Sequence, residues 1–116
     1  MATQPATGQQ QQQPLLVLST CPDDDTAARL ARALVEERLA ACVNRLPLTA
    51  STYRWQGQVV EEGEVLLLIK TVADRYPALA ERLAVLHPYQ VPEIIALPVA
   101  DGLPGYLEWM VAQTRG

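Results

Sequence analysis

The heptapeptide HPYQVPE at positions 87–93 concentrates side chains that could do chemistry. It contains the only histidine of the chain, His87, and Tyr89 and Glu93 follow within six residues. Imidazole is a good ligand for Cu(II), and a histidine beside a nucleophile can act as its general base. The segment is therefore a candidate metal site, a candidate catalytic site, or a rigid helix-to-strand turn in which two prolines restrict the backbone.

Cys21 and Cys42 are the two thiols that could assist His87. A thiolate suits Cu(I), but a selective copper site ordinarily needs three or four converging ligands, and one chain offers only His87, Cys21 and Glu93 near each other. We keep His87, Cys21 and Cys42 as candidate ligands of Cu(II) or another divalent cation, in a weak or intersubunit site. The alternatives are that Cys42 is a small buried hydrophobe and that His87 hydrogen-bonds at a helix C-terminus.

Catalysis has little support in the sequence. Cys21 with His87 is the only nucleophile and base that the expected topology could bring together. The chain has no G-x-S-x-G elbow, no phosphate-binding glycine loop and no zinc-protease helix motif. The residues therefore predict a protein that is not an enzyme and that needs no obligatory cofactor.

A set of aromatic residues with polar tips and of charged residues flanks the apolar segments of the chain. The set comprises Tyr53, Trp55, Lys70, Tyr89, Glu93 and Trp109. If a cleft between subunits gathers them, it would offer apolar walls, one cation and one anion to a small ligand. In the competing interpretation the aromatic rings anchor a subunit interface, and Lys70 and Glu93 form an ion pair.

The first half of the chain reads as a strand, a helix and a hairpin. LLVLST (15–20) is an apolar run typical of a buried strand, and the acidic triplet at 23–25 can cap a helix that the apolar spacing extends to about Ala40. Two extended segments, 42–55 and 58–72, are joined by Gln56-Gly57, where glycine suits a tight turn. These elements would place Cys21 at the end of the first strand and Cys42 at the start of the second.

The second half predicts a helix, a strand and a terminal helix. Asp74 and Pro77 suit the first turn of a helix with an apolar stripe up to Leu86, IIALPV (94–99) is a last strand, and Pro104 begins a short helix. The order β-α-β-β-α-β predicts an α+β, ferredoxin-like plait with a long hairpin between its second and third strands.

This topology places the candidate residues. His87, Tyr89 and Glu93 should lie near Cys21 at one end of the sheet, with Cys42 at the opposite end. That separation excludes a disulfide between Cys21 and Cys42 within one subunit, which agrees with a reducing compartment.

The apolar strands indicate an oligomer. Helices cover one face of such a sheet, yet LLVL (15–18), VLLLI (65–69) and IIAL (94–97) are apolar on both faces. Each hairpin arm would span about 45 Å, more than the width of a small domain, so the hairpin should project toward a neighbour. A closed, symmetric homo-oligomer would bury the open face and protect the strand edges.

Bulk composition narrows the remaining options. The 116 residues, with a formal charge of −4, fit a single domain over 15–116 and argue against nucleic acid as a partner. Residues 1–14 are uncharged and rich in glutamine, which predicts a disordered tail. The sequence has neither a membrane-spanning run of about 20 apolar residues nor a secretion signal, so we expect a cytoplasmic protein.

Five motifs, in order, resemble the CutA divalent-cation-tolerance family. They are LAACV (39–43), YRWQG (53–57), the Lys70-Thr71 pair, HPYxxPE (87–93) and YLxW (106–109), and the resemblance covers about residues 15–114. It implies a ferredoxin-like subunit, a tight homotrimer built like the PII signalling proteins, and a link to tolerance of copper and other divalent metals.

The resemblance also bears on the candidate ligands. Cys42 and His87 fall in the shared motifs, whereas Cys21 is a departure, because many relatives carry a thiol two residues earlier, where this chain has Ser19. The resulting hypothesis is a trimeric protein of cation response or signalling that binds a metal ion or small ligand. The alternative is a trimeric scaffold whose partner is another protein.

Overall fold

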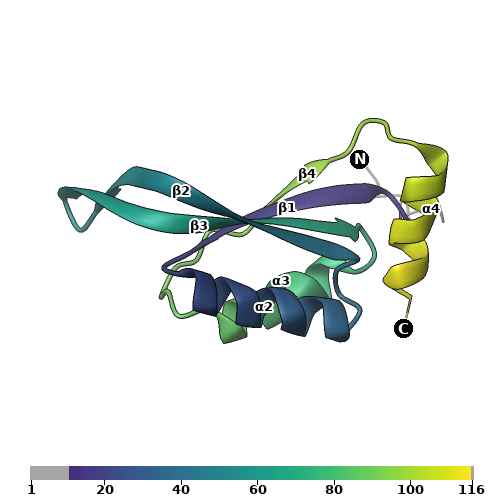
Figure 1. Cartoon of the computed structure of the whole chain (residues 1–116), viewed down its shortest axis with the longest axis horizontal. Coiled ribbons are helices and arrows are strands. Elements are labelled where there is room, and N and C mark those ends of the chain that lie inside the picture. The colour runs from purple at the N-terminus through teal and green to yellow at the C-terminus, as the bar shows by residue number, and fades with distance from the viewer. Residues whose placement is uncertain (1–10, 116) are drawn as a thin grey trace, which may run out of the picture.

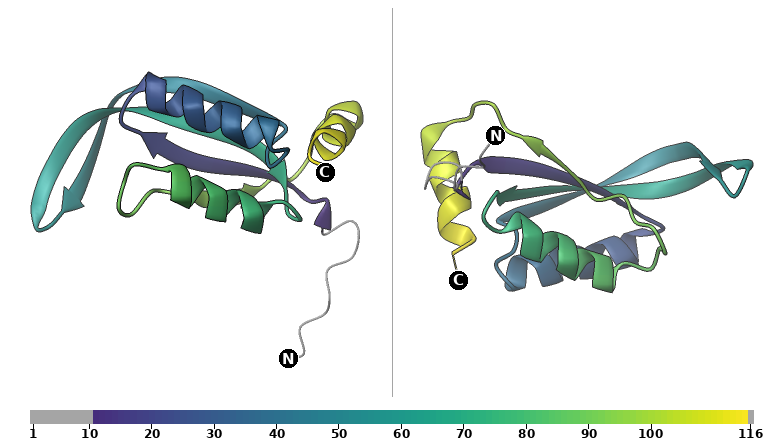
Figure 2. Two further views of the ribbon diagram at one scale, coloured as in Figure 1. Left: turned by 90° about the horizontal axis from the view of Figure 1, so that it is seen from below. Right: turned by 180° about the vertical axis from the view of Figure 1, so that it is seen from behind.

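The computed structural model describes residues 11–115, which fold as an α+β sandwich of one sheet and two helices (Figure 1). The elements run β1 (Pro14–Cys21), α2 (Asp24–Glu36), β2 (Cys42–Trp55), β3 (Gln58–Val72), α3 (Tyr76–Leu86), β4 (Ile95–Pro98) and α4 (Pro104–Gln113). The strands pair antiparallel in the order β2-β3-β1-β4, and α2 and α3 lie side by side on one face (Figure 2). The predicted ferredoxin-like plait is confirmed.

The core lies between the sheet and its two helices. Val17 of β1 and Leu67 and Ile69 of β3 point to this face and are fully buried. Leu34 of α2 and Leu83 of α3 meet them there, also with no exposed surface. Buried and less buried residues alternate along β1 and β3, so the residues between the core positions point to the face of the sheet away from the helices.

Helix α2 begins as predicted but ends earlier. The Asp23 carboxylate accepts a hydrogen bond of 2.8 Å from the backbone N–H of Thr26, which caps the first turn. The prediction that the helix reaches about Ala40 is wrong, because Arg38 adopts a left-handed φ of 58°. The N–H groups of Leu39 and Ala40 then both donate to the Leu34 carbonyl, which closes the helix end. Leu39 fits the helical spacing because it packs on the core from this turn.

Helix α3 and strand β4 frame the heptapeptide. Pro77 stands in the first turn of α3, and Leu79 and Leu83 are its buried stripe, as predicted. The helix stops at His87, which is extended because Pro88 follows. Strand β4 is confirmed but covers only Ile95–Pro98, shorter than the expected 94–99.

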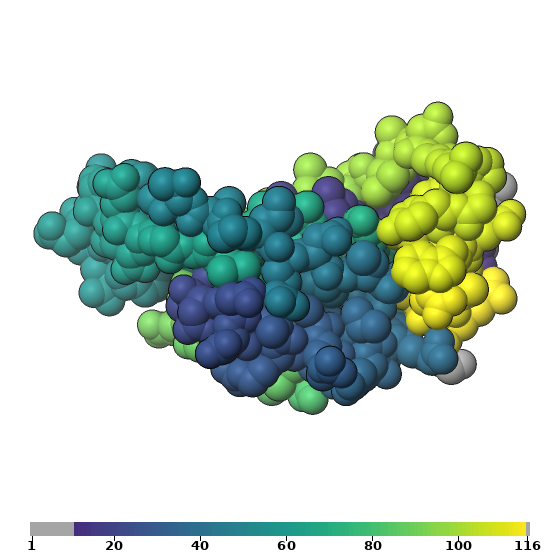
Figure 3. All heavy atoms as spheres, in the orientation of Figure 1, coloured from purple at the N-terminus to yellow at the C-terminus, as the bar shows by residue number. Residues whose placement is uncertain are grey.

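The hairpin of β2 and β3 has the predicted bounds and projects from the molecule (Figures 1 and 3). Gln56 and Gly57 turn it with φ values of 49° and 79°, which favour glycine at the second position. An extra residue in β2 between Leu48 and Ser51 shifts the register with β3. Such a bulge bends the strand, and the outer part of the hairpin curves away from the sheet (Figure 2).

The face of the sheet opposite α2 and α3 is apolar and uncovered in the single chain (Figure 2). Leu46, Ile95 and Leu97 on this face are 39%, 50% and 44% exposed, and Leu16 and Leu66 are partly exposed. The register places Leu46 opposite Leu66, and Leu97 opposite Leu16. The open apolar face expected from the sequence is therefore present.

Helix α4 stands at the end of the sheet far from the hairpin tip (Figure 1). It starts at Pro104, as predicted, and buries Met110, while Tyr106 and Trp109 remain 40% and 41% exposed. Within residues 11–115, no helix combines the length and the apolar character needed to cross a membrane.

Gln11 and Gln13 are hydrogen-bonded to the segment between β3 and α3. The carbonyl oxygens of Gln11 and Gln13 accept hydrogen bonds of 2.7 Å and 2.9 Å from the backbone N–H groups of Asp74 and Ala73. Of the predicted disordered tail of residues 1–14, Gln11, Gln13 and Pro14 thus contact the fold, and residues 1–10 lie outside the described residues.

Candidate functional site

The topology brings His87 and Cys21 together, as the sequence predicted. The Cys21 Sγ lies 4.0 Å from Nε2 of His87, and both residues are buried. Nε2 is also 2.8 Å from the Thr20 carbonyl oxygen, which can only accept, so Nε2 carries a hydrogen. Nδ1 accepts a 3.1 Å hydrogen bond from the backbone N–H of Tyr89. Both ring nitrogens of His87 are thus engaged within the fold.

The Cys21 thiol is unsuited to act as a nucleophile at neutral pH. Burial, assisted by the negative charges of Glu64 and Asp23, raises the pKa of Cys21 to about 11. The thiol therefore stays protonated at neutral pH. The nearest ring nitrogen, Nε2 of His87, already carries a hydrogen, so it cannot take the thiol proton.

The three candidate metal ligands do not meet within one chain. Cys42 is paired with Lys70 on β3, whereas Cys21 is paired with Val65, which puts the two thiols roughly 17 Å apart along the strands. Both cysteines are free. Among residues 11–115, no group of three or more His, Cys, Asp or Glu side chains is arranged to hold a metal ion. The structure therefore offers a His87–Cys21 pair, with Cys42 at the far end of the sheet.

A cavity of about 650 Å³ opens between the outer hairpin and the heptapeptide, next to the His87–Cys21 pair. Its lining consists of Thr20 from β1, residues 51–53, 55, 62 and 64 from the hairpin, and residues 88–91 and 93 from the loop. The bend at the bulge tilts the hairpin over this loop, which bends at residues 88–91 and whose backbone Pro88 and Pro92 restrict. We refer to this space as the hairpin cavity.

Two tyrosine–glutamate pairs organise the hairpin cavity. The Tyr89 hydroxyl donates a 2.7 Å hydrogen bond to Oε2 of Glu64, and the Tyr53 hydroxyl donates a 3.0 Å bond to Oε2 of Glu62. Desolvation, together with the hydrogen bond to Glu64, raises the pKa of Tyr89 above its ordinary value. For Tyr53 the hydrogen bond to Glu62 is the main cause of a raised pKa. Both hydroxyls therefore remain protonated donors to carboxylates.

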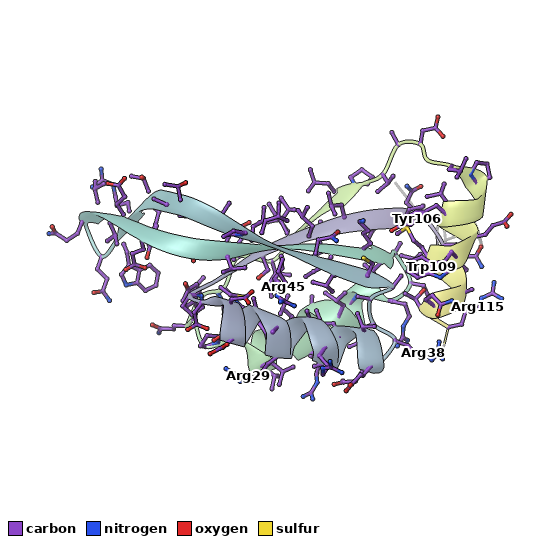
Figure 4. The ribbon with its side chains drawn as sticks, in the orientation of Figure 1. Arg29, Arg38, Arg45, Tyr106, Trp109 and Arg115 are labelled. Atoms are coloured by element: carbon purple, nitrogen blue, oxygen red, sulfur yellow. The ribbon has the colours of Figure 1, made fainter. Side chains whose placement is uncertain are left out.

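The six predicted binding residues separate into two groups. Tyr53, Trp55, Tyr89 and Glu93 line the hairpin cavity. Lys70 lies at the other end of β3, where its Nζ is 5.6 Å from the centre of the Tyr106 ring. Trp109 lies on the same helix as Tyr106, and Figure 4 shows both rings at the end of the molecule away from the hairpin. Within one chain, the predicted cation is thus absent from the predicted cleft.

Sequence reasoning missed Glu62 and Glu64, the carboxylates that bind the two tyrosines. Their alternation in EEGE (61–64) puts them on one face of β3, and the pairing of Tyr53 with Val60 puts the tyrosine diagonally across from Glu62. That signal was available, but assigning the loop and the hairpin to one cavity also required the bend at the bulge. The sequence does not specify that bend.

Comparison with known proteins gives a consistent result. The family model described as "CutA1 divalent ion tolerance protein" matches residues 15–113. The divalent-cation tolerance protein CutA of Thermus thermophilus is 56% identical over 99 residues, which are 85% of this chain and 96% of that protein. Protein CutA of Mus musculus is 52% identical over 91 residues, 78% of this chain, but this chain spans only 51% of its length.

A solved structure agrees with the sequence relatives. The crystal structure of CutA from Xylella fastidiosa superposes with a TM-score of 0.86 at 50% identity, covering 89% of this chain and 99% of that one. The residues that the family model matches include the hairpin and the heptapeptide. The chain belongs to the CutA1 family of divalent ion tolerance proteins.

Proposed function

We propose that this protein acts as a homotrimer in tolerance of, and response to, divalent metal ions, copper among them, by binding a metal ion or small molecule in a PII-like manner. The observation that carries the proposal is the hairpin cavity, which gathers four of the six residues selected from the sequence. Apolar walls with a few polar groups of fixed orientation are typical of sites for small ligands.

The open sheet face supports assembly. Ile95 and Leu97 lie half exposed on a face that a stable monomer would cover, and the hairpin projects far enough to reach a second subunit. Closed cyclic association buries such faces and leaves no open edge. The resemblance to the CutA family implies three subunits, and the hairpin cavity would then lie beside a subunit interface.

The residues do not fit a copper ion held directly by His87 and Cys21. The Nδ1 lone pair of His87 already accepts from the Tyr89 N–H, and Nε2 donates to the Thr20 carbonyl oxygen, so both ring nitrogens are occupied. A copper ion would have to displace the Tyr89 N–H from Nδ1, or break the bond to the Thr20 carbonyl oxygen and replace the hydrogen on Nε2. Within one chain, the geometry therefore favours a small molecule in the hairpin cavity over a metal ion at the His87–Cys21 pair.

The proposal has a test in cells and in solution. Native mass spectrometry of the full chain, with and without Cu(II), should give a trimer, and a monomer would contradict the assembly. In a strain that lacks its own CutA protein, the wild type should restore growth in excess copper, and Trp55→Ala should restore it less well. Val59→Ala is the matched control, because Val59 is exposed on the hairpin outside the cavity. Equal growth with both variants would contradict a role for the cavity.

The exposed apolar residues around the hairpin favour one alternative, a trimeric scaffold for another protein. Trp55, Val59 and Val91 are 42%, 66% and 69% exposed. This alternative predicts that the trimer is indifferent to metals and small ligands and that one defined partner binds in fixed stoichiometry. The same native mass spectra, recorded with that partner, separate the two functions.

We also propose a cytoplasmic location. Cys21 and Cys42 are free thiols, which suits a reducing compartment. Cell fractionation with an antibody to the full chain tests this, and recovery outside the cytosolic fraction would contradict it.

A further inference from the structure

The hairpin cavity of a single chain contains several carboxylates and no cation. Glu62, Glu64 and Glu93 line it, and its lining residues include no lysine, arginine or histidine. Lys70, the expected cation, is six residues from Glu64 along β3, roughly 20 Å away, with its Nζ over Tyr106. The cavity of a single chain is therefore anionic.

Glu64 is the carboxylate that most needs a counter-charge. It is only 9% exposed, and its Oε2 accepts the Tyr89 hydroxyl hydrogen. Among residues 11–115, its Oε1 has no hydrogen-bond partner and is not fully buried, and no lysine, arginine or histidine forms an ion pair with it. The free oxygen therefore opens toward the cavity, where a bound positive group would find a carboxylate that no cation of the same chain neutralises.

The walls of the hairpin cavity suit an organic cation. The rings of Tyr53, Trp55 and Tyr89 line it, and the faces of such rings attract ammonium and guanidinium groups. Pro88 and Val91 add apolar surface for an alkyl chain. The tyrosine hydroxyls use Oε2 of Glu62 and Glu64, which leaves the second oxygen of each carboxylate to accept from a ligand N–H.

We propose that the ligand of the hairpin cavity is a small organic cation, with a primary amine or guanidinium group on an apolar chain. This inference rests on the proposed function, because it names the ligand class of the same cavity. Glu64 accepts the buried end of the cation, Glu62 and Glu93 lie toward the opening, and Trp55 covers the alkyl chain. A bare divalent ion is a poorer match, because the described residues offer no cluster of three ligands.

Isothermal titration calorimetry on the full chain tests the ligand class. Cadaverine and agmatine are the cationic probes, and glutarate is the control, because it has the five-carbon chain of cadaverine with carboxylates at its ends. We expect the two cations to bind and glutarate not to bind, with affinity falling as salt is added. Failure of both cations to bind at millimolar concentration, or glutarate binding equally well, would overturn the proposal.

Paired variants locate the binding. Glu64→Gln and Glu62→Gln should each weaken cadaverine binding by about tenfold, because each replaces a charged acceptor by a neutral one. Glu61→Gln removes the same charge from the neighbouring residue, whose side chain points to the other face of β3, and should leave affinity unchanged. Glutamine can still accept the tyrosine hydroxyl, and Glu62 is exposed, so Glu62→Gln should fold even if Glu64→Gln does not. Equal effects of Glu61→Gln and Glu62→Gln would overturn the assignment to the cavity.

The failure of this inference is distinguishable from failure of the proposed function. If the protein is a trimer and Trp55→Ala impairs copper tolerance, but no cation binds, only the ligand class is wrong. If cadaverine binds in the cavity and Trp55→Ala has no effect on copper tolerance, the ligand class stands and the proposed function falls.

Discussion

Nε2 of His87 donates to the Thr20 carbonyl oxygen at 2.8 Å, and this bond ties the end of α3 to the end of β1. The same ring accepts from the Tyr89 N–H through Nδ1 and packs on the Tyr89 ring, with centroids 4.8 Å apart. The only histidine in the chain is therefore a cross-link that positions the loop of the hairpin cavity. In the His87 ring, Nε2 serves as a hydrogen-bond donor and Nδ1 as a hydrogen-bond acceptor.

His87→Ala should lower the free energy of unfolding by about 2–4 kcal/mol, because it removes two hydrogen bonds and leaves a gap in a buried site. Urea unfolding at one protein concentration measures this. The loss should be the same with and without Cu(II), and Gln90→Ala, an exposed change in the same loop, should have little effect. Stabilisation of the wild type by Cu(II) that disappears in His87→Ala would instead make His87 a metal ligand.

Cys21 should make the protein less stable in alkali. Its pKa is raised to about 11 from 9.0, so the unfolded chain loses the thiol proton at a lower pH than the folded chain. The contribution of the protonated Cys21 thiol to the free energy of unfolding is therefore fully present below pH 9. It is lost as the pH rises toward 11, by about 1.4 kcal/mol per pH unit. Unfolding of the wild type and of Cys21→Ala across this range should show a shallower slope for the variant. Parallel slopes would mean that the thiol does not contribute.

Asp23→Ala should destabilise the protein, because the Thr26 N–H loses its cap. That hydrogen bond lowers the pKa of Asp23 from 3.8, so its contribution is present above pH 3.8 and is lost as the pH falls through the lower, folded-state pKa. Thermal unfolding should therefore separate wild type from variant at neutral pH and bring them together in acid. Asp25→Ala, in the same triplet, is the control and should unfold like the wild type.

Ser19→Ala should raise the free energy of unfolding by about 1 kcal/mol, because it removes a buried hydroxyl. Ser19 is fully buried, and within the described residues its Oγ is the only buried side-chain oxygen or nitrogen without a hydrogen-bond partner. Chemical denaturation measures the change, with Ser51→Ala on the hairpin as control. A loss of stability would reveal a partner for the hydroxyl.

Ile95→Lys should break the proposed trimer, since it puts a charge on the open sheet face. Val85→Lys makes the same change on α3, where Val85 is 72% exposed, and should leave the trimer intact. Native mass spectrometry distinguishes the two results. A trimer from Ile95→Lys would show that another surface holds the subunits together.

Most of the fold was predictable because its signals are local. The bounds of both hairpin strands followed from period-two alternation and from one glycine turn, and the start of α2 followed from its cap. The end of α2 was not predictable in the same way. Leu39 continues the helical spacing of apolar residues, and only the left-handed φ of Arg38 reveals that the chain has already turned.

The site was predictable in part for a similar reason. The proximity of His87 to Cys21 follows from strand order alone, so the sequence could place it. Lys70 and Glu93 lie apart because Lys70 is near the end of β3 beside α4, whereas Glu93 lines the cavity near the other end of the sheet. The roles of Glu62 and Glu64 depend on a bend in the hairpin. The aromatic and charged residue types predicted a binding surface. The negative charge of the cavity became clear only from the positions of the side chains.

The register shift between Leu48 and Ser51 divides the hairpin at one point. On one side, the strands belong to the sheet and obey its packing, and on the other side they form the roof of a cavity. Substitutions beyond the shift can reshape the cavity without touching a core residue. Natural selection can therefore change the cavity through one part of the hairpin while the rest continues to preserve the fold.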